Sequence, residues 1–144
     1  GVSSAASDVY KRQVQPSGGG ISTARDLARF YSMLNGDSLC EGVNLLSPET
    51  ILEVTRIHAE GTDLSLGGYR MRGLGLVIGD SRMGCTGRSD ESSFGHAGAG
   101  TSVAWSDPVS GLSCAFITNG FRAEDTNVPR LHAISKSVRS LSTS

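Results

Sequence analysis

The sequence has no excess of charge of either sign, no long apolar run and no closely spaced pair of cysteines. Thirteen basic and 14 acidic side chains give the 144 residues a formal net charge of -1 and a pI near 6.3. Such a chain has no basic surface with which to attract nucleic acid or an anionic membrane. No apolar run approaches the roughly 20 residues that cross a bilayer. We therefore expect neither a nucleic-acid-binding protein nor a membrane-spanning segment.

The three cysteines, Cys40, Cys85 and Cys114, are an odd and widely spaced set, which indicates neither a disulfide framework nor a zinc site. We expect Cys114, inside LSCAFIT, to be the core thiol. The chain also lacks Ser-x-x-Lys, Gly-x-Ser-x-Gly, His-Glu-x-x-His, a phosphate-binding loop and a dinucleotide-binding fingerprint. The sequence therefore indicates no cofactor and no metal ion.

Two other groups of ionisable side chains have simple interpretations. Glu49 and Glu53 share one helix face, and pairs with this spacing are normally solvated. We expect His58 and His132, both in helical segments, to be ordinary partly buried or surface histidines.

The N-terminal residues resemble a technical sequence. Residues 3–13, SSAASDVYKRQ, match at every position the forward-frame translation of a common transposase-based sequencing-library adaptor. We therefore expect residues 1–13 to be an adaptor-derived, disordered artefact without a part in the fold, the alternative being a short polar tail. On this hypothesis Val14 is a boundary of the sequence read, and residues 14–144 are the C-terminal part of a longer domain.

Helical patterns occupy the first half of the remaining chain. A helix is predicted after Thr23 as N-cap, with Asp26 three residues on, and it ends before Gly36. Its apolar face is predicted to hold Leu27, Phe30, Tyr31 and Leu34. A second helix starts with Ser47 as N-cap and Pro48 at its first position and is predicted to reach His58 or Ala59.

Extended patterns follow, and a helix closes the chain. Strands are predicted within residues 73–79, 101–107 and 112–118, the last two forming an antiparallel hairpin around Pro108 and Gly111. Residues from Asp125 on return to helical spacing, with Leu131, Ile134, Val138 and Leu141 on one face. The predicted fold class is α+β, with helices packed on an antiparallel sheet.

The stretch FGHAGAG, residues 94–100, sets one histidine among small residues where a strand begins. Together with TSVAWSDPVSGLSCAFITNGF after it, this stretch resembles the final third of the serine β-lactamase and penicillin-binding-protein family. Upstream, PSGGGISTARDLARFYSMLNG and LLSPETI resemble the helical segment that follows the family's tyrosine motif. The branch is that of class C β-lactamases, esterases and D-aminopeptidases. The resemblance covers about residues 14–140, with four separated pieces in the expected order, and it implies the C-terminal part of a β-lactamase/transpeptidase-like fold.

In that family a Lys-Thr-Gly or His-x-Gly triad opens the strand that lines the active site, and His96-Ala97-Gly98 fits the second form. The resemblance implies that Ala99 supplies a main-chain N–H to the developing oxyanion, an interaction worth roughly 3–4 kcal/mol. It further implies that Gly98 keeps the strand surface open. His96 would take the place of the family's lysine, bonding either to the proton network of the nucleophile or to a substrate carboxylate, and histidine can do this in either charge state near neutral pH. The alternative for His96 is a structural residue that ties strand to loop.

The family nucleophile and base lie on a Ser-x-x-Lys helix assisted by a Tyr-x-Asn or Tyr-x-Ser motif, and Tyr10, Tyr31 and Tyr69 do not fit that pattern. We therefore expect a partial serine acyl hydrolase for a small ester, amide or lactam, with its nucleophile upstream of Val14. Two alternatives stay open, because fold does not determine function. One is a non-catalytic scaffold or interaction protein that keeps the fold; the other is an unrelated α+β binding domain.

Overall fold

The computed structural model describes residues 20–36, 45–86 and 91–141. The predictions for residues 1–13 and for Cys40 fall outside these ranges. Six antiparallel strands form one sheet in which each strand lies beside the next along the chain. The strands are β1 (Ala59–Thr62), β2 (Tyr69–Arg72), β3 (Val77–Ile78), β4 (Phe94–Ala97), β5 (Val103–Asp107) and β6 (Leu112–Phe116). The α+β prediction is confirmed, and the three predicted strands share one sheet.

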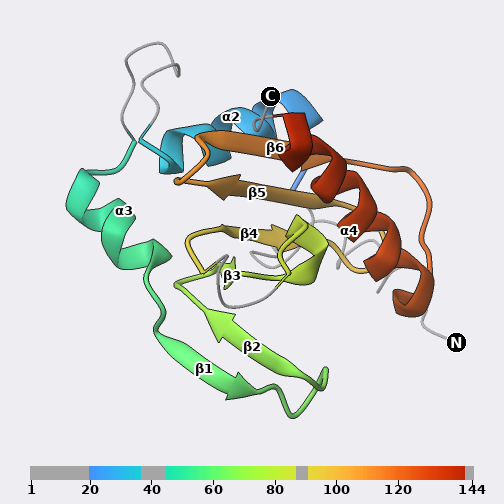
Figure 1. Cartoon of the computed structure of the whole chain (residues 1–144). Helices are drawn as coiled ribbons and strands as arrows, with labels where there is room; N and C mark the ends of the chain where they lie inside the picture. Colours follow the sequence, from blue (N-terminus) through green and yellow to red (C-terminus); the bar gives the residue numbers. More distant parts are fainter. Residues whose placement is uncertain (1–19, 37–44, 87–90, 142–144) are drawn as a thin grey trace, which may run out of the picture.

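Helices cover both faces of the β5–β6 half of the sheet, with α4 across the front and α2 behind (Figure 1). The helices are α2 (Ala24–Leu34), α3 (Pro48–Thr55), the 3-10 turn η1 (Ser81–Met83) and α4 (Glu124–Ser140). Because strand side chains alternate between faces, Ala104 joins the α2-side cluster around Phe94. Trp105, its neighbour on β5, joins the α4-side cluster with Leu131. Trp105 is completely buried and is therefore a core aromatic.

Helix α2 begins where its capping residues predict. The hydroxyl of Thr23 accepts the N–H of Asp26 at 3.1 Å, and Gly36 ends the helix with φ +79°, a conformation that glycine adopts without strain. The predicted apolar face is wrong in one position: Phe30 is 44% exposed, whereas Met33 is buried. The ring of Phe30 instead lies edge-on against Tyr31.

Helix α3 ends at Thr55, earlier than predicted, because the chain turns into a hairpin that the sequence did not indicate. Arg56 is already extended, with ψ 160°, and the N–H of His58 donates to the carbonyl of Arg72 at 2.8 Å. The N–H of Leu74 donates to the carbonyl of Val54 at 3.0 Å. Pairing of β1 with β2 therefore replaces the last predicted turn of the helix.

Both apolar and polar groups of helix α4 contact the rest of the fold. The apolar face predicted for it is correct at Leu131 but wrong at Leu141, which is 75% exposed and lies beyond the helix end. Ser135, completely buried, accepts the indole N–H of Trp105 at 3.0 Å and donates to the carbonyl of Arg82 at 2.8 Å. Through these two hydrogen bonds, Ser135 of α4 holds β5 and η1 together.

Arg139 adds a second clamp between α4 and the sheet. Its guanidinium lies 4.4 Å from the ring centroid of Trp105 and 2.9 Å from the carboxylate of Asp107. Burial alone would raise the pKa of Asp107, but the hydroxyl of Ser110, the N–H of Val109 and Arg139 outweigh it and hold that pKa below its ordinary value. The folded protein therefore favours the ionised form of this carboxyl.

The thiol prediction needs correction. Cys85 is the buried thiol, 4% exposed and packed beside Met83 and Trp105, whereas Cys114 is only half-buried. The side chain of Cys114 faces the α4 side of β6, an outer strand of the sheet. Cys85 follows η1, which α4 covers.

Candidate active-site cleft

The strand β4 is held tightly on one side and open on the other at its C-terminal end. Gly95 faces Trp105 across the β4–β5 pair, and a Cβ at Gly95 would overlap the carbonyl oxygen of Ala104. On the opposite side, β3 pairs with β4 only at Phe94 and Gly95. From His96 onward, no strand of the described part of the chain covers that side. The open edge therefore arises because β3 is two residues long.

Hydrogen-bond alternation shows which main-chain groups point to the open side. The N–H of Gly98 donates to the carbonyl of Ser102 at 2.8 Å, toward β5. Because N–H and C=O groups change sides at each residue of an antiparallel strand, those of Ala97 point the other way, into the open side. The sequence prediction named Gly98 and Ala99 but missed Ala97. The pairing register could have identified it, since β5 was predicted.

The turn after β4 is held by the segment around the start of α4. The N–H of Arg122 donates to the carbonyl of Gly100 at 2.8 Å, and the guanidinium of Arg130 donates to the carbonyl of Thr101 at 3.0 Å. A Cβ at Gly98 would lie 2.7 Å from the hydroxyl of Ser102 and 2.9 Å from that of Thr101. The absent side chain of Gly98 thus leaves room for the hydroxyls of its own turn.

His96 is exposed on the α2 side of β4. Its Nδ1 lies 2.9 Å from the carbonyl oxygen of Ala97, the next residue. This contact joins the ring to its own strand and does not tie the strand to a loop. The ring therefore stands beside the main-chain groups that face the open side.

A single hollow of about 710 Å³ collects the predicted site residues. His96, Ala97, Gly98 and Ala99 all line it, and we call this hollow the β4 cleft. Its lining comes from both faces of the sheet, with Tyr31 from the α2-side cluster and Met83 from the α4-side cluster. The remaining walls come from α2, the β1–β2 hairpin, η1 and the first turns of α4; they include Leu27, Tyr31, Leu66, Met83 and Val128.

Tyr31 enters the β4 cleft from α2 and was not predicted as a site residue. It is 6% exposed, and burial raises its pKa to about 12. At neutral pH the side chain is therefore a neutral phenol, which can donate a hydrogen bond but cannot act as a phenolate base.

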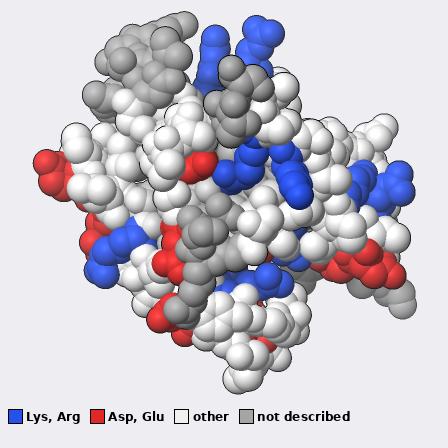
Figure 2. All heavy atoms as spheres, in the orientation of Figure 1, with Lys and Arg blue, Asp and Glu red and all other residues white. Residues whose placement is uncertain are grey.

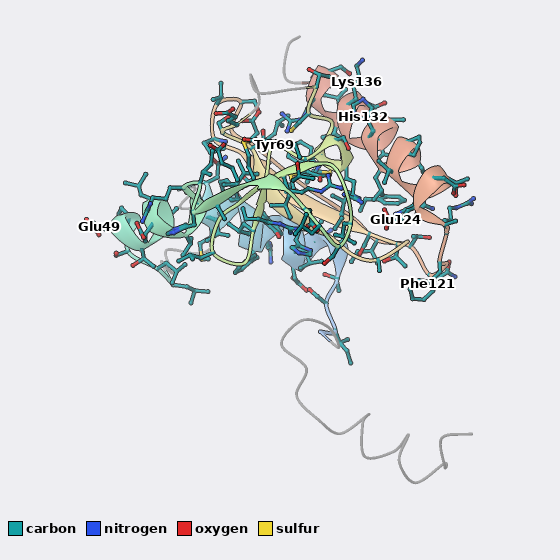
Figure 3. All side chains as sticks on the ribbon, turned by 90° about the horizontal axis from the view of Figure 1, so that it is seen from below. Glu49, Tyr69, Phe121, Glu124, His132 and Lys136 are labelled. Atoms are coloured by element: carbon teal, nitrogen blue, oxygen red, sulfur yellow. The ribbon has the colours of Figure 1, made fainter. Side chains whose placement is uncertain are left out.

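Charged side chains line the α4 side of the β4 cleft as ion pairs. Asp80 lies 3.1 Å from both Arg70 and Arg82, and Arg82 also reaches Glu124 at 2.7 Å. Burial alone would lower the pKa of Arg82, but the bonds and charges of Glu124 and Asp80 raise it. Figure 3 labels Glu124 at the first turn of α4, at the same end as Phe121. Arg70, Arg72 and Arg82 were not recognised from the sequence, because only the fold gathers them.

The other ionisable residues considered from the sequence lie outside the β4 cleft. Glu49 points away from the sheet (Figure 3), and Glu53 pairs with Arg56 at 2.7 Å. His58 and His132 contact main-chain oxygens of Glu53 and Ser81. These contacts are structural.

The molecular surface has no single-signed field on the face shown in Figure 2, where blue and red atoms are interspersed with white. Among the described side chains, no three His, Cys, Asp or Glu residues gather as a metal-ligand set. None of the described helices has the length and apolar character needed to cross a membrane.

Comparisons with known proteins agree with this architecture. The chain is 30% identical to Esterase/beta-lactamase LipL of Mycobacterium tuberculosis over 108 residues, which cover 72% of the chain and 23% of LipL. A penicillin-binding-protein homologue from Caulobacter crescentus superposes with a TM-score of 0.71 at 30% identity, over 89% of this chain and 36% of that one. A beta-lactamase from Mycobacterium bovis superposes with a TM-score of 0.65 at 24% identity, over 85% of this chain and 45% of that one. The chain thus spans less than half the length of these relatives.

The model of one protein family, described as beta-lactamase, matches residues 2–137. The match begins before Val14, and the adaptor origin of residues 1–13 stays a prediction. The match includes nearly the whole chain, and β4 and the residues that line its cleft lie within it. This protein therefore belongs to the beta-lactamase family.

Proposed function

We propose that this chain is the C-terminal part of a serine acyl hydrolase that works through an acyl-enzyme on a small ester, amide or lactam. The nucleophile and its base come from sequence upstream of Val14, since the 144 residues contain no Ser-x-x-Lys. The chain alone is therefore inactive. One observation carries the proposal: His96, Gly98 and Ala99 line a single cleft at the open edge of β4.

The open edge has the groups that acyl transfer needs. When a serine oxygen attacks the substrate carbonyl, negative charge develops on the carbonyl oxygen, and preorganised N–H donors stabilise it. Ala99 supplies such a donor, and the main-chain groups of Ala97 pair with the substrate beside it. Both are held by a strand and a turn that α4 fixes in place, so little reorganisation is needed in the transition state.

His96 takes part as a hydrogen-bonding group next to the reacting carbonyl. Its ring is exposed within the β4 cleft, where it can bond to the proton network of the nucleophile or to the substrate. A side chain that transfers or shares a proton in the transition state typically contributes about 10²–10⁴-fold to the rate.

The test compares the 144-residue chain with the longer protein that begins at the upstream initiator methionine. We expect no steady hydrolysis of p-nitrophenyl butyrate or a chromogenic cephalosporin by the chain, and turnover of at least one by the longer protein. In the longer protein, His96→Ala lowers kcat/KM by about 10² or more, whereas His132→Ala, a histidine outside the cleft, does not. Steady turnover by the chain alone would refute the upstream nucleophile.

The second candidate is a non-catalytic scaffold or interaction protein with the same fold. The absence of Ser-x-x-Lys from these 144 residues is the observation that favours it. A continuous upstream reading frame without Ser-x-x-Lys would support the scaffold, and its presence with a Tyr-x-Asn or Tyr-x-Ser motif would support the hydrolase.

A further inference from the structure

Two leucines stand exposed at the tip of the β1–β2 hairpin, and only one of them borders the β4 cleft. Leu64 is 97% exposed and Leu66 is 70% exposed. Leu66 lines the cleft. In Figure 1 the hairpin tip lies on the same side of the molecule as the first turn of α4, which borders the cleft through Glu124 and Val128. Leu66, Glu124 and Val128 therefore border the same cleft from two different elements.

The hairpin tip holds the main chain of Leu66 in a defined position. One carboxylate oxygen of Asp63 accepts the N–H groups of Ser65 and Leu66, both at 2.9 Å. The N–H of Asp63 donates to the carbonyl of Gly68 at 2.9 Å, and Arg72 reaches the second carboxylate oxygen at 3.1 Å. Because these bonds already order the turn, little ordering entropy is lost when a ligand contacts Leu66.

Each arginine that lines the β4 cleft already has a carboxylate partner. The pairs are Arg70–Asp80, Arg82–Asp80, Arg82–Glu124 and Arg72–Asp63, with N···O distances of 2.7–3.1 Å. An anionic ligand would have to separate such a pair or bind beside its carboxylate, which costs desolvation and repulsion. An uncharged ligand meets no such cost.

Apart from these ion pairs, the α4 side of the β4 cleft is apolar. Val77, Met83, Val103 and Val128 line it between the hairpin and the open edge, and the first three are buried. Because these three side chains are only 1–8% exposed, the apolar area that a ligand can cover here comes from partly exposed Val128 and from Leu66. A ligand whose carbonyl lies at Ala97–Ala99 can therefore place an alkyl group against these two side chains. The gain in free energy rises with the apolar area removed from water.

We propose that Leu66 is a specificity-determining residue: it forms the wall of the β4 cleft that contacts the uncharged alkyl part of an acyl ligand. This inference rests on the proposed function for the position of the carbonyl group. It adds the substrate class, a neutral aliphatic acyl group, and the residue that selects it.

The test uses the full 144-residue chain and stable, uncharged probes, the N-methyl amides of butanoic, hexanoic and octanoic acid. Binding is followed by NMR titration of the ¹⁵N-labelled chain. We expect the dissociation constant to fall by up to about fourfold for each CH₂ group that becomes buried. Leu66→Ala weakens octanoyl binding at least fivefold and changes butanoyl binding less than twofold.

Matched variants distinguish the loss of the Leu66 contact with the ligand from a general disturbance of the hairpin. Leu64→Ala, on the same turn but outside the cleft, leaves the chain-length dependence unchanged, and Leu66→Met retains it. Equal losses in Leu64→Ala and Leu66→Ala, or no loss in Leu66→Ala, overturn the inference. Tighter binding of octanoate than of its N-methyl amide overturns the assignment of an uncharged ligand.

The same titration distinguishes this inference from the proposed function. Movement of the Ala97–Ala99 N–H signals without an effect of Leu66→Ala leaves the acyl site in place and refutes the role of Leu66. A Leu66-dependent chain-length effect without movement of those signals supports the alkyl wall and refutes the placement of the carbonyl at β4.

Discussion

Replacing Gly95 by alanine tests whether close packing of β4 on β5 sets the position of the cleft edge. The added Cβ would overlap the carbonyl oxygen of Ala104 and lie 2.7 Å from Cα and Cβ of Trp105. Neither group can rotate away, because one belongs to the main chain of β5 and the other to a completely buried tryptophan. We expect Gly95→Ala to lower the free energy of unfolding by about 3 kcal/mol, the upper end of the usual cost of overpacking.

Gly98→Ala is the matched control, three residues further along the chain and just beyond the end of β4. The only atoms that its Cβ would approach within 3 Å are the side-chain hydroxyls of Ser102, at 2.7 Å, and Thr101, at 2.9 Å. A hydroxyl can turn to another rotamer, so we expect the free energy of unfolding to fall by less than about 1 kcal/mol. Gly98→Ala should instead weaken the binding of acyl probes, since Gly98 lines the β4 cleft.

Urea unfolding followed by tryptophan fluorescence measures both variants. Trp105 is the only tryptophan of the 144 residues, and it lies opposite Gly95 in the β4–β5 pair, so its emission reports on this contact. With an m-value of about 2 kcal/mol/M, a loss of 3 kcal/mol lowers the midpoint by about 1.5 M. Equal midpoints for wild type and Gly95→Ala, or equal losses in both glycine variants, would refute the packing argument.

Two further predictions concern acid stability and the turn after β4. Because the pKa of Asp107 is lowered in the folded protein, ionised Asp107 adds to the free energy of unfolding above the ordinary carboxyl pKa of about 3.9. This added stability is lost as the pH falls below that value. The free energy of unfolding of Asp107→Asn should therefore fall less between pH 5 and 3 than that of wild type; parallel curves would contradict this. Arg130→Ala should speed hydrogen exchange in the turn around Thr101 at least tenfold, whereas the exposed Lys136→Ala should not; unchanged exchange in Arg130→Ala would contradict the clamp.

Features fixed by neighbouring residues were predictable from the sequence. The caps at Thr23 and Ser47 act within one turn of helix, and the β5–β6 hairpin follows from the local signals at Pro108 and Gly111. The β1–β2 hairpin was missed because AEGT has no apolar alternation. Its strand conformation depends on pairing with β2, which is a tertiary effect that local propensity does not contain.

The candidate site divides in the same way. His96, Gly98 and Ala99 could be selected because they form one contiguous stretch, and the structure places all three in one cleft. Leu66 and Arg82 could not be selected, since Leu66 lies in the β1–β2 turn and Arg82 in η1, and only the folded chain brings these elements beside β4. Buried Ser135 was missed for a related reason: in the sequence it is a polar residue between the apolar ones of α4, and only its tertiary bonds to the indole N–H of Trp105 and the carbonyl of Arg82 explain its burial.

The shortness of β3 has a consequence for how this protein can change over time. The open edge of β4 exists because the neighbouring strand β3 stops after two residues. The hydrogen-bonding groups along this edge are therefore the N–H and C=O groups of the main chain of β4. Side-chain substitution leaves a main-chain N–H in place at every residue except proline. Mutations at Leu66 and the other walls can therefore change the shape of the cleft, while the main-chain N–H and C=O groups of the open edge persist. For the proposed hydrolase, this separation allows a lineage to explore new substrates while the proposed carbonyl-binding groups stay in place.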